Sequence, residues 1–580
     1  MLVLKGVAAS PGVAIGPAVL LPGESFALSR QYIGENEIPA ETKKIQAAMQ
    51  KTLAELDQCE KKVLDTLGTE YANLMSTHKL ILQDPAFHKT ILHKIQKEQL
   101  SAQAAILFTL QELTSSFNKI EDPFFKERRN DFFDVGKRLA NNLEEGKAKF
   151  LPTITKSSLL VAHNLYPSDT INLQENHILG FCTDVGGKTS HTALLAQSLN
   201  LPAVVGLATA SKDVHAGDML IIDGENGLLV INPDRYTLSN YRKIQRDIKK
   251  TDALLKTINH LPIITQDGHP VKLFVNYDPR TDTKANKHLI TDGLGLLRTE
   301  FVFMGTPLPP TEEEQHDVYL AVAKRFDMRP VTIRLADLGA DKMPDFPLDE
   351  FDQDDNPFMG CRGVRLLLKN PDLLRTQLRA IIRTACEVPA QVHIMVPMIS
   401  SVEEVRHVRR AFNEILHEFA EHGKHPTNKI ALGAMIEVPS AALALDGMIG
   451  ELDFISIGTN DLIQYLIAVD RINQEVAHMY DPCHPAVIRT LNLIIQTAHK
   501  RGKTVSICGE LASDAKMLPL LLGLNLDALS VTPRMFLRVK NNIRNSNFEH
   551  CSDLAQAALL MGSSEEIRQL IEQNDQHENS

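Results

Sequence analysis

Short apolar segments alternate with helix-patterned segments eight times in the C-terminal half of this sequence. The apolar segments have the length of strands and cover residues 272–278, 293–299, 331–337, 393–398, 432–438, 454–460, 504–510 and 528–531. Strands that alternate with helices form parallel sheets, because each helix carries the chain back to the start of the next strand. Eight such repeats within about 260 residues predict a (β/α)8 barrel.

Polar and charged residues occur at or just beyond the ends of five of these segments. They are Arg298 and Glu300, Asp337, Glu437, Asn460 and Asp461, and Cys508 and Glu510. One charged residue in such a place is ordinarily explained by solvation of a loop. Enzymes with a (β/α)8 barrel assemble their active sites at the carboxyl ends of the strands. The same bias in five segments therefore predicts a catalytic site at that face.

Glu437 and Asp461 are the candidate metal ligands of this site. Each follows an apolar strand, and neither has a histidine or a cysteine beside it. Oxygen ligands of this kind favour Mg²⁺, which keeps water and substrate oxygens in its coordination shell. We therefore expect a magnesium ion at the ends of these strands.

Five arginines of the same region are candidates for binding a phosphate and a carboxylate in bidentate fashion: Arg298, Arg334, Arg362, Arg365 and Arg471. Taken singly, each is more often a surface ion-pair partner. Arg334 differs, because it lies within the apolar segment VTIRLAD, where a buried charge needs an anionic partner.

One histidine, His191, follows a glycine pair and two hydroxyl residues in the run Gly186-Gly187-Lys188-Thr189-Ser190-His191. Glycines allow the backbone to approach a ligand closely, and the first turn of a helix favours an anion. An apolar, helix-patterned run begins directly after the histidine. His191 is therefore a candidate phosphoryl carrier, and the alternative is a histidine packed in an ordinary loop-to-helix junction.

The N-terminal part changes pattern twice. Residues 1–21 and 147–233 contain strand-like segments and predict one β/α domain. Residues 22–146 predict an inserted α-helical bundle, because apolar residues recur there three and four positions apart, among them Ile45, Met49, Leu53, Leu56, Val63, Leu64 and Leu67. A charged helix within 234–262 links this part to the barrel, residues 263–580.

The composition excludes several classes of protein. The chain of 580 residues has 72 acidic and 61 basic side chains, a formal net charge of −11, which argues against nucleic acid as a partner. The seven cysteines are scattered, without a C-x-x-C pair, which indicates a reducing compartment and neither a disulfide framework nor a zinc site. No run reaches the ~18 apolar residues of a membrane span, so we expect a cytoplasmic protein.

Several motifs occur together and in order along the chain. They are ASPGVAIG at 9–16, NDFFDVGKRL at 130–139, GGKTSHTA at 186–193, GLGLLRTEF at 293–301, IRLADLGADK at 333–342, NPFMGCRGVR at 356–365, MIEVPSA at 435–441, FISIGTNDLIQYLIAVDR at 454–471 and CGELASD at 508–514. This set resembles the Enzyme I family of the bacterial sugar phosphotransferase system, a branch of the enzymes that use phosphoenolpyruvate (PEP). The resemblance extends over nearly the whole chain.

The resemblance implies a phosphoryl relay. Mg²⁺ would be held by Glu437 and Asp461, and PEP would be bound by Arg298, Arg334, Asn460, Asp461 and Arg471. His191 would attack phosphorus and form a phosphohistidine, and Cys508 would protonate the enolate carbon. The family also implies a swivelling phosphohistidine domain, docking of the phosphocarrier protein HPr on the helical bundle, and a homodimer formed through the barrel.

Relatives that transfer the phosphoryl group to a nucleotide carry a large ATP-binding domain, whereas this chain has a helical insert, which favours a protein acceptor. Four positions depart from the family pattern: Gln197 and Lys188 stand where arginines are usual, Cys361 where an aromatic residue is usual, and Asn164 where an aspartate is usual. These departures keep an alternative open. In that alternative the chain is a degenerate or regulatory paralogue that senses PEP or serves a regulatory phosphorelay.

Overall fold

The computed structural model describes most of the chain in two compact units, Met1–Asp252 and Ala253–Ser580. The described residues are 1–21, 31–67, 69–117, 131–132, 134–136, 138–140, 142–143, 157–165, 177–187, 192–193, 196, 201–278, 289–304, 306, 308–340, 342, 344, 346, 356–471, 473 and 475–578.

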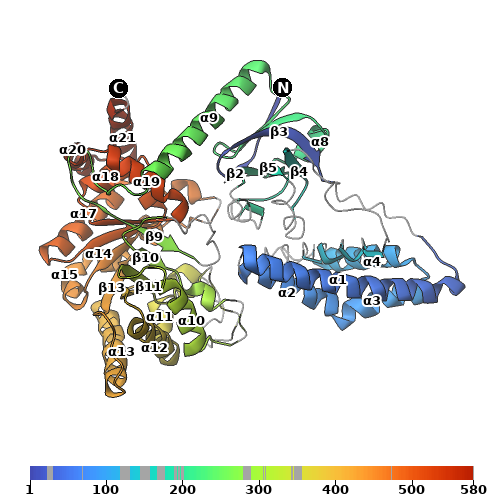
Figure 1. Cartoon of the computed structure of the whole chain (residues 1–580), viewed down its shortest axis with the longest axis horizontal. Helices are drawn as coiled ribbons and strands as arrows, with labels where there is room; N and C mark the ends of the chain where they lie inside the picture. Colours follow the sequence, from blue (N-terminus) through green and yellow to red (C-terminus); the bar gives the residue numbers. More distant parts are fainter. Residues whose placement is uncertain are drawn as a thin grey trace. The chain divides into compact units, whose positions relative to one another are not determined.

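The second unit is a closed barrel of eight parallel strands (Figure 1). The strands are β9 (Lys272–Tyr277), β10 (Leu294–Leu297), β11 (Pro330–Arg334), β12 (Gln391–Val396), β13 (Ala431–Ile436), β14 (Ile455–Gly458), β15 (Val505–Cys508) and β16 (Ala528–Val531). Each strand pairs with the next in chain order, and β16 closes the ring on β9. The barrel and its eight strands, predicted from the sequence, are confirmed.

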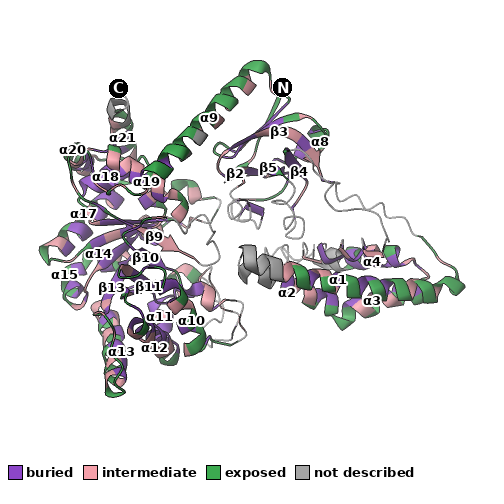
Figure 2. Ribbon diagram, viewed as in Figure 1, coloured by how far each residue is buried: buried purple, intermediate pink, exposed green. Residues whose placement is uncertain are grey.

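Helices surround this barrel. They are α10 (Glu312–Ala323), α11 (Val364–Lys369), α12 (Pro371–Glu387), α13 (Val402–Glu421), α14 (Pro439–Leu443), α15 (Leu445–Met448), α16 (Thr459–Leu466), α17 (Pro485–Lys500), α18 (Leu518–Gly523), α19 (Pro533–Asn545), α20 (Phe548–Leu560) and α21 (Ser564–Glu578). Figure 2 shows buried strands inside the ring and helices with one exposed face outside it. Capping boxes begin α10, at Thr311 and Glu314, and α13, at Ser401 and Glu404.

The inside of the barrel contains a cluster of buried apolar side chains. Leu296, Met395, Met435 and Cys508 are buried together, with Phe454 packed against them. A Cβ atom at Gly433 would lie 2.5 Å from ring atoms of Phe454, so only glycine leaves room for that ring. The site must therefore lie above this packed layer, at the carboxyl ends of the strands, which we call the barrel mouth.

The first unit contains a mixed eight-stranded sheet in the order β1-β8-β7-β3-β4-β5-β6-β2. Its strands are β1 (Leu2–Lys5), β2 (Val7–Ser10), β3 (Val13–Leu20), β4 (Ser158–Ala162), β5 (Ile178–Thr183), β6 (Ala203–Val205), β7 (Met219–Asp223) and β8 (Leu228–Ile231), with the short helix α8 (Ala210–Asp213). Strands β3 to β6 pair in parallel, and the outer pairs are antiparallel. Segments distant in the sequence thus form one sheet.

The helices of the first unit are α1 (Ile38–Leu67), α2 (Thr69–Gln83), α3 (Pro85–Gln96) and α4 (Ala102–Phe117). Their core contains Ile45, Met49 and Leu56, with Leu53 half-buried against it, as the periodicity predicted. The side chains of Val63, Leu64 and Leu67 lie outside the described residues. The predicted multidomain α/β fold class is confirmed.

The predicted linker helix is α9 (Arg235–Thr257). Leu238, Tyr241 and Ile248 of α9 pack on a small apolar cluster of the sheet, and the Tyr241 hydroxyl donates to Asp223 Oδ2 over 3.0 Å. Among the helices of the described ranges, none is long and apolar enough to cross a membrane.

Candidate active site at the barrel mouth

The strand ends bring most of the expected side chains to the barrel mouth. Arg334 is the last residue of β11 and Cys508 the last of β15, and Glu437 follows β13 directly. Asn460 and Asp461 lie in the first turn of α16, directly after β14. Because all eight strands are parallel, these positions share one end of the barrel.

Arg334 has the anionic partners that its place in an apolar strand predicted. Its side chain is almost completely buried, and Nη2 lies 2.7 Å from Glu300 Oε1 and 3.4 Å from Asp337 Oδ2. Burial is the largest influence on the Glu300 carboxyl and raises its pKa, but the charges of Arg334, Lys342 and Arg298 together outweigh burial and hold that pKa below its usual range. Both partners are therefore ionised at neutral pH.

Arg362 connects two buried carboxylates. Its Nε and Nη2 donate to Asp337 Oδ1 and Oδ2, each over 3.0 Å, and its Nη1 and Nη2 donate to Asp461 Oδ1 and Oδ2 over 3.1 and 3.3 Å. The Tyr465 hydroxyl is 3.1 Å from Nη1, and Lys342 Nζ donates to Asp337 Oδ2 over 2.9 Å. This network fixes Asp461, one of the two expected metal ligands, in place.

Glu437, the other expected ligand, is 1% exposed and accepts the Met398 N–H over 2.7 Å. Burial raises the pKa of its carboxyl to about 8, and the nearby carboxylates Asp461 and Asp337 add to that rise. Gly458 makes room for this side chain, because a Cβ atom there would lie 2.6 Å from Glu437 Oε2. Buried oxygen donors that repel one another in this way fit a hard divalent cation.

Asn460 and Cys508 lie on neighbouring elements of the mouth. Asn460 Oδ1 accepts the Glu510 N–H over 3.1 Å, and the Ser456 hydroxyl donates to Cys508 Sγ over 3.6 Å. Burial raises the pKa of the Cys508 thiol, and the Ser456 hydrogen bond only partly opposes this. The thiol is therefore protonated at neutral pH, as a proton donor must be.

Two arginines of the mouth have unsatisfied donors. Arg334 Nε and Arg471 Nε are buried without a hydrogen-bond acceptor in the described parts of the chain. Buried N–H groups nearly always have an acceptor, so both groups are available to an anionic ligand. Arg298, by contrast, is exposed, and its charge still lowers the pKa of Glu300 and of Cys508.

The structure thus brings together Arg334, Glu437, Asn460, Asp461 and Cys508. The charge of Arg298 acts on the same site, through Glu300 and Cys508. Arg471 is close enough to Tyr480 to lower the pKa of that hydroxyl, which burial and the carboxylates of Glu510 and Asp461 raise. His191, Lys188 and Gln197 lie outside the described residues.

The segment around His191 is described only in part. Gly186, before it, has φ 122°, a conformation that favours glycine. Thr192 and Ala193, directly after it, are helical and buried, and the Thr192 hydroxyl donates to Leu165 O over 3.2 Å. The two described residues that follow His191 are therefore part of a helix.

Sequence reasoning missed three residues of the mouth, Lys342, Tyr465 and Gln377. Gln377 on α12 donates to Thr299 Oγ1 over 3.1 Å and accepts the Ala336 N–H over 2.9 Å. Nothing in an amphipathic helix distinguishes such a glutamine from one at the surface. Lys342 lies five residues after Asp337 within IRLADLGADK, a signal that was available.

Comparison with known protein families covers the chain in three blocks. Residues 252–548 match the PEP-binding domain of PEP-utilising enzymes, residues 5–128 match the N-terminal domain, and residues 154–227 match the mobile domain. The first block alone includes more than half of the chain and contains the whole barrel mouth. The fold and the site therefore define a PEP-utilising enzyme.

Curated relatives narrow this class. The chain is 37% identical to the phosphoenolpyruvate-protein phosphotransferase of Haemophilus influenzae over 570 residues, 98% of both chains. It is 35% identical to those of Priestia megaterium, over 98% of both chains, and of Bacillus subtilis, over 97% of this chain and 98% of the relative. The chain belongs to the phosphoenolpyruvate-protein phosphotransferases, the Enzyme I family of the phosphotransferase system.

Proposed function

We propose that this chain transfers the phosphoryl group of PEP to His191, with release of pyruvate, and then to a histidine of HPr. This is the first step of sugar uptake by the phosphotransferase system. The observation that carries the proposal is the barrel mouth, where buried guanidinium groups with unsatisfied donors lie among carboxylates suited to a cation. The full-length relationship to phosphoenolpyruvate-protein phosphotransferases supports it.

Substrate binding is assigned to the cationic and amide groups of the mouth. Arg298, Arg334, Asn460 and Arg471 bind the phosphate and the carboxylate of PEP, and Asp461 completes the substrate site. Guanidinium groups suit both anions, because their planar donors match two oxygens at once. Their positive charge also stabilises the charge that develops as the phosphoryl group departs.

A magnesium ion is assigned to Glu437 and Asp461. When bound, it would neutralise oxygens of the transferring phosphate. Asp461 is ion-paired with Arg362, so that arginine must share or release the carboxylate when a cation binds. The raised pKa of Glu437, caused by burial and then by neighbouring carboxylates, supports a site that is more stable with a cation than without one.

The two covalent events involve His191 and Cys508. The unprotonated imidazole nitrogen of His191 attacks phosphorus, the bond from phosphorus to the bridging oxygen breaks, and the enolate of pyruvate remains in the barrel. The protonated Cys508 thiol donates its proton to the enolate carbon and regains one from solvent. Its burial among apolar side chains and its raised pKa support this acid role.

The parts of the chain take separate roles in this proposal. Residues 1–21 and 147–233 form the phosphohistidine domain, 22–146 the HPr-binding bundle, 234–262 the linker, and 263–580 the PEP-binding and dimerisation domain of a homodimer. The family matches at 5–128, 154–227 and 252–548 support a division into three blocks. The proposed location is the cytoplasm.

The test is incubation of the purified protein with PEP and Mg²⁺, with and without HPr, following pyruvate and acid-labile phosphate. Stoichiometric pyruvate and phosphohistidine that passes to HPr are expected, and His191→Ala abolishes both. Cys508→Ala slows pyruvate formation by about 10²-fold or more, the usual contribution of a general acid, whereas Cys386→Ala on α12 does not. PEP binding without any release of pyruvate would overturn the proposed enzymatic activity and favour the alternative, a regulatory PEP sensor.

A further inference from the structure

Helix α10 carries a histidine whose ring lacks hydrogen bonds although it is buried. His316 is 2% exposed, and within the described ranges neither Nδ1 nor Nε2 has a hydrogen-bond partner. Buried polar atoms are nearly always hydrogen-bonded in native proteins. Each ring nitrogen nevertheless has a carboxylate oxygen at ion-pair distance, so a cation held between the ring and a carboxylate would satisfy it.

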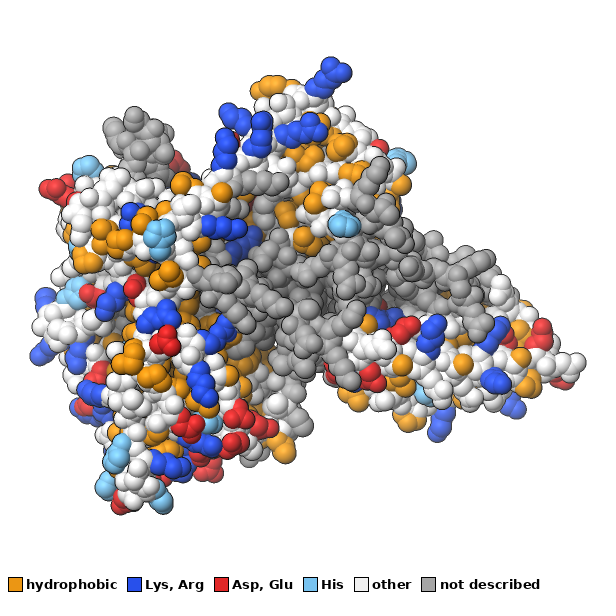
Figure 3. All heavy atoms as spheres, in the orientation of Figure 1, with side chains coloured by type: hydrophobic (Ala, Val, Ile, Leu, Met, Phe, Trp, Pro, Cys, Tyr) orange, Lys and Arg blue, Asp and Glu red, His pale blue; other side chains and the backbone are white. Residues whose placement is uncertain are grey.

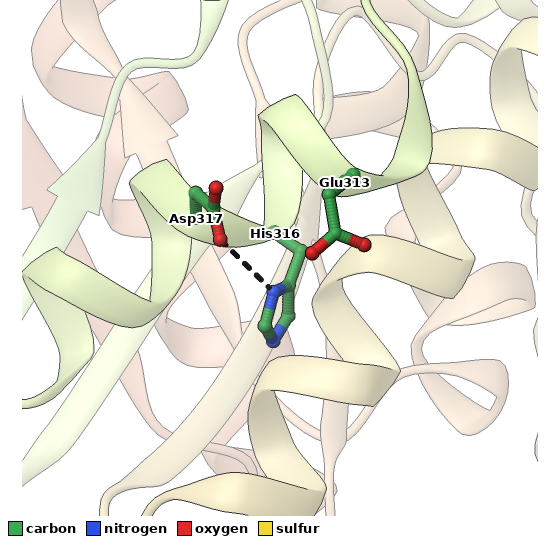
Figure 4. A group of neighbouring side chains, drawn as sticks. All are labelled: Glu313, His316 and Asp317. Atoms are coloured by element: carbon green, nitrogen blue, oxygen red, sulfur yellow. Dashed lines mark ion pairs between the residues drawn. The ribbon is translucent and has the colours of Figure 1, made fainter.

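Carboxylates lie on both sides of this ring. Asp317 Oδ1 is 3.6 Å from Nδ1, and Glu387 Oε1 on α12 is 3.3 Å from Nε2. Glu313 precedes His316 by three residues, a spacing that places both on one face of the helix. Figure 4 shows the side chains of Glu313 and Asp317 beside the imidazole, all three from α10.

The three residues of α10 meet the spatial requirement of a metal site. One ligand atom from each of Glu313, His316 and Asp317 lies within 4.8 Å of the others, and among the described residues this is the one group of its kind. Ligand atoms of a tetrahedral zinc site with bonds of about 2.1 Å lie about 3.4 Å apart. The side chains of Glu313 and Asp317 are 64% and 70% exposed. Their rotation can therefore bring the ligand atoms from the present spacing of up to 4.8 Å to the spacing of a zinc site.

The charge around the ring also favours a cation. Glu313, Asp317 and Glu387 are three carboxylates. Arg383 donates to both oxygens of Glu313, over 2.7 and 3.3 Å, and its Nε lies 3.6 Å from Glu387 Oε1, so a metal ion would displace one of the two bonds to Glu313. Arg379 is already paired with Glu312 and Glu418. Figure 3 shows acidic and basic side chains side by side over this region. One guanidinium leaves two of the three negative charges uncompensated, which suits a divalent ion.

Glu387 orients the His316 ring, as carboxylates beside metal-binding histidines commonly do. A carboxylate beside Nε2 favours the tautomer with its proton on Nε2, which leaves the lone pair on Nδ1 to bind a metal. That lone pair is on the side of Asp317. The same contact ties α10 to α12, because Glu387 is the last residue of α12.

We infer that Glu313, His316 and Asp317 form a binding site for a divalent transition-metal ion of the zinc type, oriented by Glu387. A histidine with two carboxylates favours Zn²⁺ or Co²⁺ over Mg²⁺, because imidazole suits the softer ions. The site is on the helical shell of the barrel and does not include Glu437 or Asp461. It is thus independent of the proposed phosphotransfer.

The test is equilibrium dialysis of chelator-treated full-length protein against Zn²⁺, with excess Mg²⁺ present. His316→Gln and Asp317→Asn are compared with the wild type and with Glu312→Gln, which removes a carboxylate from the same helical turn but none of the ligands. The wild type and Glu312→Gln are each expected to bind one Zn²⁺ ion tightly at this site. Both ligand variants are expected to lose at least tenfold in affinity at that site.

The absorption spectrum of bound Co²⁺ distinguishes metal binding at this site from metal binding by cysteine thiolates. Co²⁺ bound by His316 and carboxylates gives visible ligand-field bands without a thiolate charge-transfer band, and Asp317→Asn should abolish them. The exposed Asp317 is the decisive position, because its substitution does not disturb the core if His316→Gln fails to fold. Equal Zn²⁺ affinity in the wild type and Asp317→Asn, or a thiolate band in place of the expected bands, would overturn the inference.

Discussion

At the scale of single residues, Arg362 is the main structural cation of the barrel mouth. It is 2% exposed and bonds to both Asp337 and Asp461. Removal of one partner of a buried ion pair leaves an uncompensated charge, so Arg362→Ala should lower the free energy of unfolding by about 3–5 kcal/mol. Chemical denaturation of the full chain, followed through the transition of the barrel, measures this loss.

Arg375→Ala is the matched control for this prediction. Arg375 of α12 bonds to Glu414 and Glu418 of α13 through partly exposed side chains, and ion pairs at a protein surface contribute about 0–1 kcal/mol. If Arg362→Ala lowers the free energy of unfolding by no more than Arg375→Ala, the ion pairs of Arg362 do not stabilise the barrel.

At the scale of elements, His393 of β12 and Gly433 of β13 lie beside Phe454, the residue that directly precedes β14. The His393 and Phe454 rings lie 5.3 Å apart, and burial lowers the pKa of His393 to about 4. An unfolded histidine has a pKa of about 6.5. Between these values the unfolded chain binds more protons than the folded one, so stability falls as pH decreases from about 6.5 to 4.

His393→Leu should remove this part of the acid sensitivity. The wild type should lose up to about 3 kcal/mol more than the variant between pH 7 and pH 4, since each unit of pKa shift corresponds to about 1.4 kcal/mol. Urea unfolding midpoints at several pH values provide the comparison. The exposed His425 supplies the control His425→Leu, which should follow the wild type. Parallel curves for the wild type and His393→Leu would contradict the prediction.

At the scale of the whole molecule, the two compact units should unfold separately. All eight barrel strands and their core lie within Ala253–Ser580, so a fragment of residues 253–580 should fold alone. Its calorimetric transition is expected within about 4 °C of the matching transition of the full chain, a shift that corresponds to about 1 kcal/mol in a large domain. A single cooperative transition of the full chain, or an unfolded fragment, would show that the units depend on each other.

The eight barrel strands were predictable because each is a short apolar segment between helical patterns, a local signal that the barrel preserves. The anionic partners of Arg334 were predictable in kind, since a charge inside an apolar strand needs them. Their identity was not, because Glu300 and Asp337 follow two different strands. The bidentate capture of Asp461 by Arg362, 99 residues apart, depends on how the loops close over the mouth.

By itself the sequence determined the barrel, the helical insert, the polar residues at the strand ends and the family, because periodicity and motifs are properties of neighbouring residues. Only the tertiary structure decided which charges pair, which donors stay unsatisfied and how far a buried carboxyl such as Glu437 is driven from its usual pKa. It also revealed His316 among carboxylates of α10 and α12, which no spacing in the sequence distinguished. Burial and distance set these properties, and both arise only when remote segments pack together.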